Sequence, residues 1–145
     1  MKHLILILLL FCLKNTYAQT MTSLDVFTSQ RANWQNDYVE VAYVALRCAV
    51  LENILGGYMN QSSNPDHKAL GQNALIMAKK LTELSALATI KQPKYDLNTL
   101  KQQHEVISRD YLDAMSKNQK LNNSVFTEKV RSDHNFCYKF GESLQ

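Results

Sequence analysis

Two cysteines are the residues of this chain that most clearly favour a covalent bond. Cys48 and Cys137 lie in amphipathic segments, whereas the third cysteine, Cys12, lies in an apolar run near the start of the chain. In an oxidising compartment, two such cysteines favour one disulfide over two free buried thiols or a metal pair. The sequence therefore predicts a disulfide between Cys48 and Cys137, with free thiols and a shared metal as the alternatives.

Two histidines are the candidate cofactor ligands. His104 falls on the apolar stripe of a predicted helix, where an inward histidine is most often a hydrogen-bonded core residue. His134 lies three residues before Cys137, so the two share a helix face. A zinc site needs about four nitrogen or sulfur ligands, and the chain has no Cys-x-x-Cys or His-x-x-x-His pair. We predict no metal site and no cofactor, and keep haem or metal binding at His104 or His134 as the alternative.

Motifs for nucleophilic catalysis and phosphate binding are absent from the sequence. There is no Gly-x-Ser-x-Gly, no Ser-x-x-Lys and no glycine-rich loop. The adjacent pairs His104-Glu105 and Asp133-His134 could transfer protons, but such neighbours are common by chance. The sequence therefore favours a protein that is not an enzyme and predicts no catalytic residues, with a small hydrolytic enzyme as a weaker alternative.

Two tyrosines are candidates for contact with a partner. Tyr58 and Tyr95 both fall in predicted links between helices. Exposed tyrosine is favoured at interfaces because it offers a large contact area. A half-buried structural role is an equally good interpretation of both residues.

The first eighteen residues have the three-part pattern of a secretory signal peptide. A short basic start precedes an apolar run from Leu4 to Leu13, and small residues at Thr16 and Ala18 favour cleavage after Ala18. The apolar run is too short to span a bilayer, which takes about 20 helical residues. We predict a cleaved signal at 1–18, one domain at 19–145 and an exported protein, either periplasmic or extracellular.

The rest of the chain shows helical patterning. Apolar residues recur at spacings of three and four over four segments, about 31–55, 65–90, 97–117 and 124–140. Asn64 and Asp96 are expected to cap the starts of the second and third helices. Gly56-Gly57 and Gly141 are expected to end the first and last of the four helices, and a shorter amphipathic piece covers 24–30. The sequence predicts an all-α fold, an antiparallel four-helix bundle of up-down-up-down order with one disulfide between helices.

Composition limits the partners of such a bundle. The 145 residues are 46% hydrophobic, and loss of Lys2 and Lys14 with the signal would lower the net charge from +3 to +1. Nucleic-acid binders usually carry a clustered basic face, and none is evident. We therefore expect no nucleic-acid partner, no transmembrane segment after signal removal, and a role in protein binding, in self-association or as a structural or accessory subunit.

Overall fold

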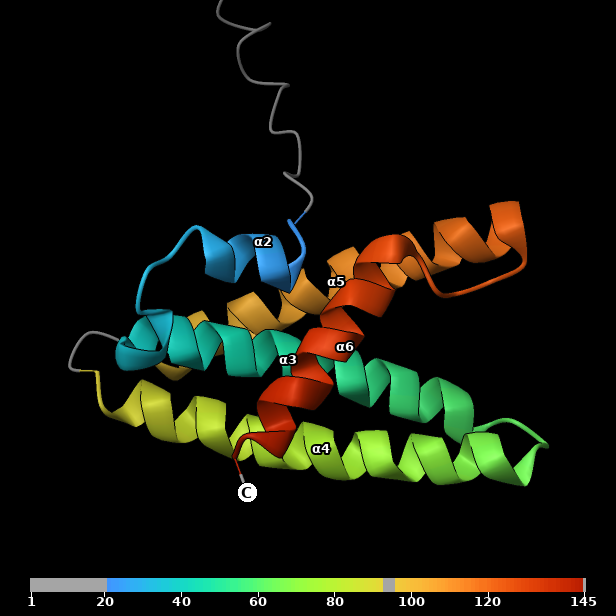
Figure 1. The fold of residues 1–145 in the computed structure, drawn as a ribbon, viewed down its shortest axis with the longest axis horizontal. Coiled ribbons are helices and arrows are strands. Elements are labelled where there is room, and N and C mark those ends of the chain that lie inside the picture. Colours follow the sequence, from blue (N-terminus) through green and yellow to red (C-terminus); the bar gives the residue numbers. More distant parts are fainter. Residues whose placement is uncertain (1–20, 93–95, 145) are drawn as a thin grey trace, which may run out of the picture.

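The computed structural model describes residues 21–92 and 96–144, and the regular structure within them is helical (Figure 1). The all-α prediction is confirmed. Five α-helices and one 3₁₀ turn follow in chain order: α2 (Leu24–Ser29), η1 (Trp34–Asn36), α3 (Tyr38–Asn60), α4 (Pro65–Ile90), α5 (Leu97–Asn122) and α6 (Glu128–Glu142).

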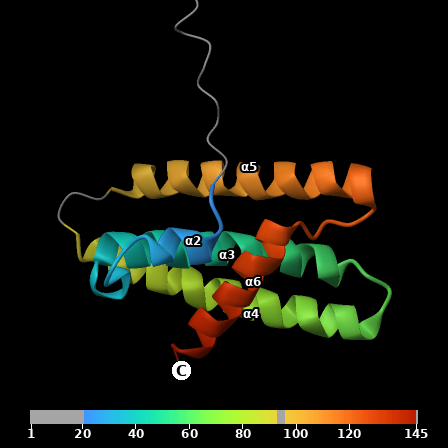
Figure 2. The same cartoon turned by 45° about the horizontal axis from the view of Figure 1, so that its top comes forward.

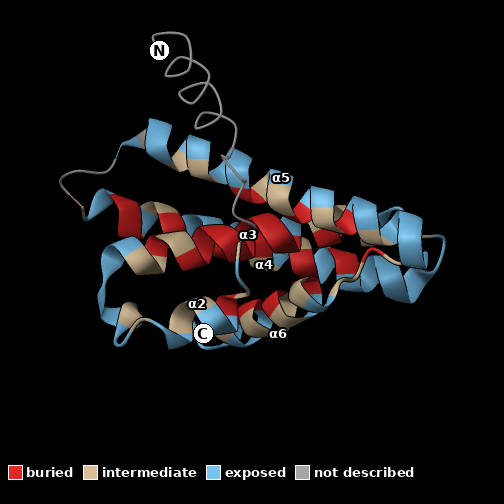
Figure 3. Cartoon of the chain, turned by 90° about the horizontal axis from the view of Figure 1, so that it is seen from above, coloured by how far each residue is buried: buried red, intermediate tan, exposed pale blue. Residues whose placement is uncertain are grey.

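The predicted up-down-up-down bundle is not confirmed. The helices α3, α4 and α5 do alternate in direction, but α6 crosses α3 obliquely and reaches α4 instead of lying along the bundle (Figures 1 and 2). The segment 24–29 forms a separate helix, α2, which packs on α6. The fold therefore consists of three long helices with α2 and α6 on one side of α3 (Figure 3).

Helix α3 is the centre of the core. It has neighbours in α4, α5 and α6, and burial is concentrated along it (Figure 3). A helix that is apolar on all sides is stable only when other helices surround it. The core around it includes Leu51, Leu55, Leu81, Ile107 and Val130, each no more than 1% exposed.

The prediction that Gly56-Gly57 ends the first long helix is wrong, because α3 continues to Asn60. Gly56 lies against α4, where an added Cβ would come within 2.9 Å of the Gly71 carbonyl oxygen and 2.8 Å of Leu75. A Cβ on Gly71 would likewise meet the Gly56 carbonyl at 2.9 Å. Gly56 and Gly71 therefore permit close packing of α3 on α4, and the Gly56-Gly57 pair does not cap α3.

Side-chain caps start α3, α4, α5 and α6. Asp37, Asn64, Asp96 and Thr127 each accept a hydrogen bond from a backbone N–H in the first turn of α3, α4, α5 and α6, respectively. The predicted starts of α4 and α5 at Asn64 and Asp96 are confirmed. Gly141 is the second-last residue of α6, and Ser143 is the C-cap in its place. The backbone of Gly141 packs on Met77 of α4, where an added Cβ would have no room.

The predicted signal peptide, residues 1–18, lies outside the described residues. Among the helices that are described, none has the length and apolar character needed to cross a membrane.

Candidate functional site

The disulfide between Cys48 and Cys137 is confirmed. It joins α3 to α6 with a Cα–Cα distance of 5.2 Å across a sequence separation of 89 residues. Both cysteines are fully buried. Cys48 lies near the middle of α3. Because α6 crosses α3 obliquely at this point, Cys137 comes level with Cys48.

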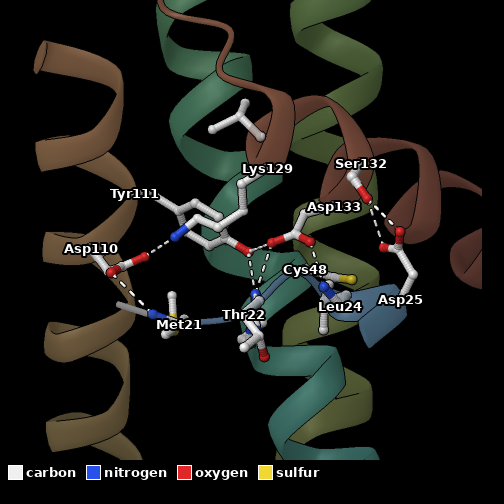
Figure 4. A network of polar contacts seen from close by, with 12 residues as sticks. Met21, Thr22, Leu24, Asp25, Cys48, Asp110, Tyr111, Lys129, Ser132 and Asp133 are labelled. Carbon is white, nitrogen blue, oxygen red and sulfur yellow. Dashed lines mark hydrogen bonds and ion pairs between the residues drawn. The ribbon is translucent and has the colours of Figure 1, made fainter. Parts of the chain in front are cut away.

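A buried ion pair lies beside the disulfide (Figure 4). Arg47 of α3 donates to the Asp133 carboxylate of α6 at 2.8 Å, and Tyr111 of α5 donates to the same oxygen at 2.5 Å. The second carboxylate oxygen accepts from the backbone N–H of Leu24 at 2.6 Å, while Arg47 also donates to the Thr22 carbonyl at 2.8 Å. One network thus joins three helices and the segment before α2.

Burial and charge set the protonation of this network. Burial raises the pKa of Tyr111 well above its usual value, and the nearby Asp133 carboxylate raises it further. For Arg47, burial acts to lower the pKa, but Tyr111 and Asp133 outweigh it and leave the pKa raised. At neutral pH Tyr111 is therefore a neutral phenol and Arg47 a guanidinium, and both donate hydrogen bonds to the buried Asp133 side chain.

A second polar pair joins the same two helices one turn away. His134 of α6 donates from Nδ1 to the Glu52 carboxylate of α3 at 2.8 Å. Glu52 is 3% exposed and His134 is 35% exposed at the side chain. The hydrogen bond to Glu52 raises the pKa of His134, although partial burial opposes the shift. Relative to a free histidine, the pair therefore favours the protonated ring of His134 over the neutral one.

His134 opens onto a hollow between α4 and α6. The hollow has a volume of about 530 Å³, and its polar lining residues include the Glu52–His134 pair, Asn73, Lys80 and Glu142. Leu70, which is 55% exposed, and Ile76, which is 58% exposed, give its wall an apolar surface that faces solvent.

A second hollow adjoins the first. It has a volume of about 630 Å³ and lies at the ends of α3 and α5, against the link that leads into α6. The two hollows share the lining residues Met59, Leu70 and Phe126. We call the two together the α4 groove, which has an apolar middle and polar side chains toward both ends.

The structure separates the two predicted cofactor ligands. His134 lines the first hollow of the α4 groove. His104 is exposed on α5 and lines a different hollow against α3 and α4, so the prediction that it faces the core is wrong. The helix carries its apolar face at Ile107, Tyr111 and Met115 instead. No group of three or more potential metal ligands occurs within residues 21–92 and 96–144.

The predicted contact tyrosines have different outcomes. Tyr58 is 51% exposed, as expected for a surface contact, and lines the second hollow of the groove. It lies in the last turns of α3 and not in a link. Tyr95 lies outside the described residues.

Sequence reasoning missed the partners that hold these groups. Arg47 and Glu52 are charged residues within the apolar stretch 41–55, and both are buried. Arginine and glutamate are almost never fully buried unless they are paired. Their isolation in an apolar run was the signal that each has a partner elsewhere, although the sequence could not identify Asp133 and His134 as those partners.

Comparison of the chain with protein-family models, curated proteins and solved structures gives no match.

Proposed function

We propose that this protein is an exported helical protein that acts by binding, and that the α4 groove receives an extended apolar segment of a partner protein. The observation that carries this proposal is the pair of adjoining hollows, whose shared lining residues are Met59, Leu70 and Phe126. Concave, largely apolar surfaces with a few polar groups are the usual form of a binding site.

Side-chain amides near the groove favour a peptide as the occupant. Gln61, Gln119 and Asn123 line the second hollow, and Asn73 lines the first. An amide side chain both donates and accepts hydrogen bonds, so it can satisfy the main-chain groups of an extended peptide. A hydrocarbon chain would offer these amides no hydrogen bonds.

The protonation of His134 favours binding over catalysis. Its pKa is raised by the hydrogen bond to Glu52, which reduces the neutral imidazole available as a general base. The same pairing occupies Nδ1 and leaves Nε2 as the ring nitrogen that a ligand could contact. Haem or metal binding at His134 is a weaker candidate because no group of three or more potential metal ligands occurs among the described residues. Hydrolysis of a small substrate is weaker because the sequence carries no Gly-x-Ser-x-Gly or Ser-x-x-Lys motif.

Export is part of the proposal. The sequence pattern of 1–18 supports a cleaved signal peptide, and a disulfide is consistent with an oxidising compartment. Such a compartment is the periplasm or the outside of the cell, and the partner is expected to be another protein there.

Selection from a library of extended peptides tests this function. We expect the oxidised protein to enrich peptides with consecutive apolar residues, and Leu70→Asp to abolish the enrichment. Leu112→Asp is the matched control, because Leu112 is 51% exposed on α5 and does not line the groove. Enrichment that survives Leu70→Asp would exclude the groove, and displacement of all selected peptides by a fatty acid would indicate an acyl-chain site instead.

A further inference from the structure

The outer face of α4 carries a stripe of exposed residues that no described helix covers. Ile76, Lys80, Glu83, Leu87 and Ile90 follow one another at spacings of four, three, four and three. This alternation places them along one side of the helix, as in the seam of a coiled coil. We call these five residues the α4 stripe.

The apolar members of the α4 stripe are unusually open to solvent. Ile76 is 58% exposed, Leu87 is 60% exposed and Ile90 is 80% exposed. Between them lie Lys80 and Glu83, both exposed, and neither forms an ion pair with another described residue. The stripe is therefore apolar toward both ends and carries one charge of each sign at its centre.

We propose that the α4 stripe is the contact surface of a symmetric dimer, in which α4 of one copy packs antiparallel on α4 of a second copy. The order of the residues supports this occupant. With the two-fold axis midway between positions 80 and 83, Lys80 lies opposite Glu83 of the second copy. In the same register Ile76 lies opposite Leu87 of the second copy.

Symmetry doubles each of these pairs. A two-fold interface places the same patch on both copies, so every contact occurs twice. Two Lys–Glu pairs therefore lie at the centre, flanked by two Ile–Leu pairs. A parallel arrangement would instead place like charges side by side, which is unfavourable. The charge order thus selects a second copy in the antiparallel direction.

The interface is small, and this sets its strength. An interface made of one helix face per copy buries less surface than the ~1,600 Å² of a typical stable complex. We therefore expect a weak, concentration-dependent dimer with a dissociation constant in the micromolar range.

This inference goes beyond the proposed function and does not rest on it. Glu83, Leu87 and Ile90 do not line the α4 groove, whereas Ile76 and Lys80 do. Because these two residues belong to both surfaces, we expect dimer formation and partner binding to compete.

Charge reversal tests both the contact and its direction. Lys80→Glu places acids opposite acids in the antiparallel register, and Glu83→Lys places bases opposite bases. Each variant alone should be monomeric when its mass is measured by sedimentation equilibrium on the oxidised protein. An equal mixture of the two variants should restore a heterodimer, because every central pair then joins opposite charges.

A second variant tests the apolar part without touching the groove. Leu87→Asp should raise the dimer dissociation constant by about tenfold or more, as expected for loss of a buried interface anchor. Leu112→Asp on α5 should leave it unchanged. Circular dichroism and an intact mass confirm that each variant is folded and oxidised.

Three results would overturn the dimer. They are a wild-type protein that stays monomeric at millimolar concentration, charge-reversal variants that still dimerise alone, and a mixture that stays monomeric. If Leu70→Asp abolishes peptide binding and leaves the dimer intact, the α4 groove and the α4 stripe are supported as separate surfaces. An intact groove with no dimer would remove this inference and leave the proposed function standing.

Discussion

Asp133 is the residue on which most of the buried polar structure depends. Its two carboxylate oxygens accept from Arg47, Tyr111 and the backbone of Leu24. Breaking a buried ion pair is costly because the remaining charge has no compensation in the core. Asp133 is 0% exposed, so water cannot replace the lost interactions.

We expect Asp133→Asn to lower the free energy of unfolding by about 3–5 kcal/mol, because Arg47 would be left as an unpaired buried cation. Urea denaturation of the oxidised protein measures this change. Asp113→Asn is the matched control, since Asp113 is exposed on α5, and its effect should stay within about 0.5 kcal/mol. Equal effects of the two substitutions would contradict a structural role for the network.

His134 makes stability depend on pH in a defined direction. The hydrogen bond to Glu52 raises its pKa in the folded protein. A group whose pKa is raised by folding binds its proton more tightly in the native state. Its contribution to stability is therefore fully present below the unfolded pKa of about 6.5 and is lost as pH rises through the folded value.

We expect Glu52→Gln to lower the pKa of His134, as measured by an NMR titration of its ring protons. The advantage in stability of the wild type over this variant should shrink between about pH 6 and about pH 8, where histidine loses its proton. Glu105→Gln, at an exposed position of α5, is the control and should change neither quantity. A titration of His134 that does not respond to Glu52→Gln would show that the pair does not form in solution.

At the scale of the helices, the sequence predicted what local chemistry determines. The range 65–90 for α4 and the caps at Asn64 and Asp96 follow from residue type and spacing, and the structure has them. The end of α3 at Asn60 could not be predicted from residue type and spacing. A Gly-Gly pair is equally compatible with a helix end and with a close helix approach, and only the position of α4 decides between them.

Two neighbouring glycines of α3 should therefore respond in opposite ways to the same substitution. Gly56→Ala should destabilise the protein by about 1–3 kcal/mol, because its Cβ would press on the backbone of α4. Gly57→Ala should stabilise it by about 0.5–1 kcal/mol, because a Cβ there meets nothing within 4 Å and alanine is the better helix former.

Thermal or urea unfolding of the two alanine variants measures the difference directly. The substitutions are the same in chemistry and adjacent in sequence, so each is the control for the other. Destabilisation by both would mean that the helix ends before these residues, whereas stabilisation by both would mean that α3 and α4 are not in close contact.

At the scale of the whole molecule, the crossing of α3 and α6 determines the shape. The disulfide, the Arg47–Asp133 pair and the Glu52–His134 pair all join these two helices. The sequence predicted the disulfide because it shows a signal-peptide pattern and, beyond residue 18, a single pair of cysteines. It could not predict the crossing angle, which depends on contacts between residues far apart in the chain.

The α4 groove could not be predicted from the sequence either, because it too depends on contacts between residues far apart in the chain. Its central residues Met59, Leu70 and Phe126 come from three separate segments. The spacing of apolar residues in α4 would put Leu70 on the core side, yet Leu70 is 55% exposed. The position of α6 leaves this part of α4 uncovered, and periodicity within α4 carries no information about α6.

Removal of the disulfide should weaken the whole fold. We expect Cys48→Ala with Cys137→Ala to lower the free energy of unfolding by about 2–5 kcal/mol, since the bond restricts a long loop in the unfolded chain. Comparison of denaturation midpoints with and without a reductant gives the same quantity in the wild type. Two reactive thiols in the protein as isolated under non-reducing conditions would contradict the bond.

Site-specific photo-crosslinking tests whether the α4 groove holds a segment of another protein. A photoreactive amino acid would replace Leu70 in the protein produced in its native host, with replacement of Leu112 as the control. We expect the crosslink from position 70 to map by mass spectrometry to an apolar segment of a different protein, and position 112 to give no such product. Crosslinks at both positions to the same proteins, or at position 70 only to lipid, would contradict the proposed function.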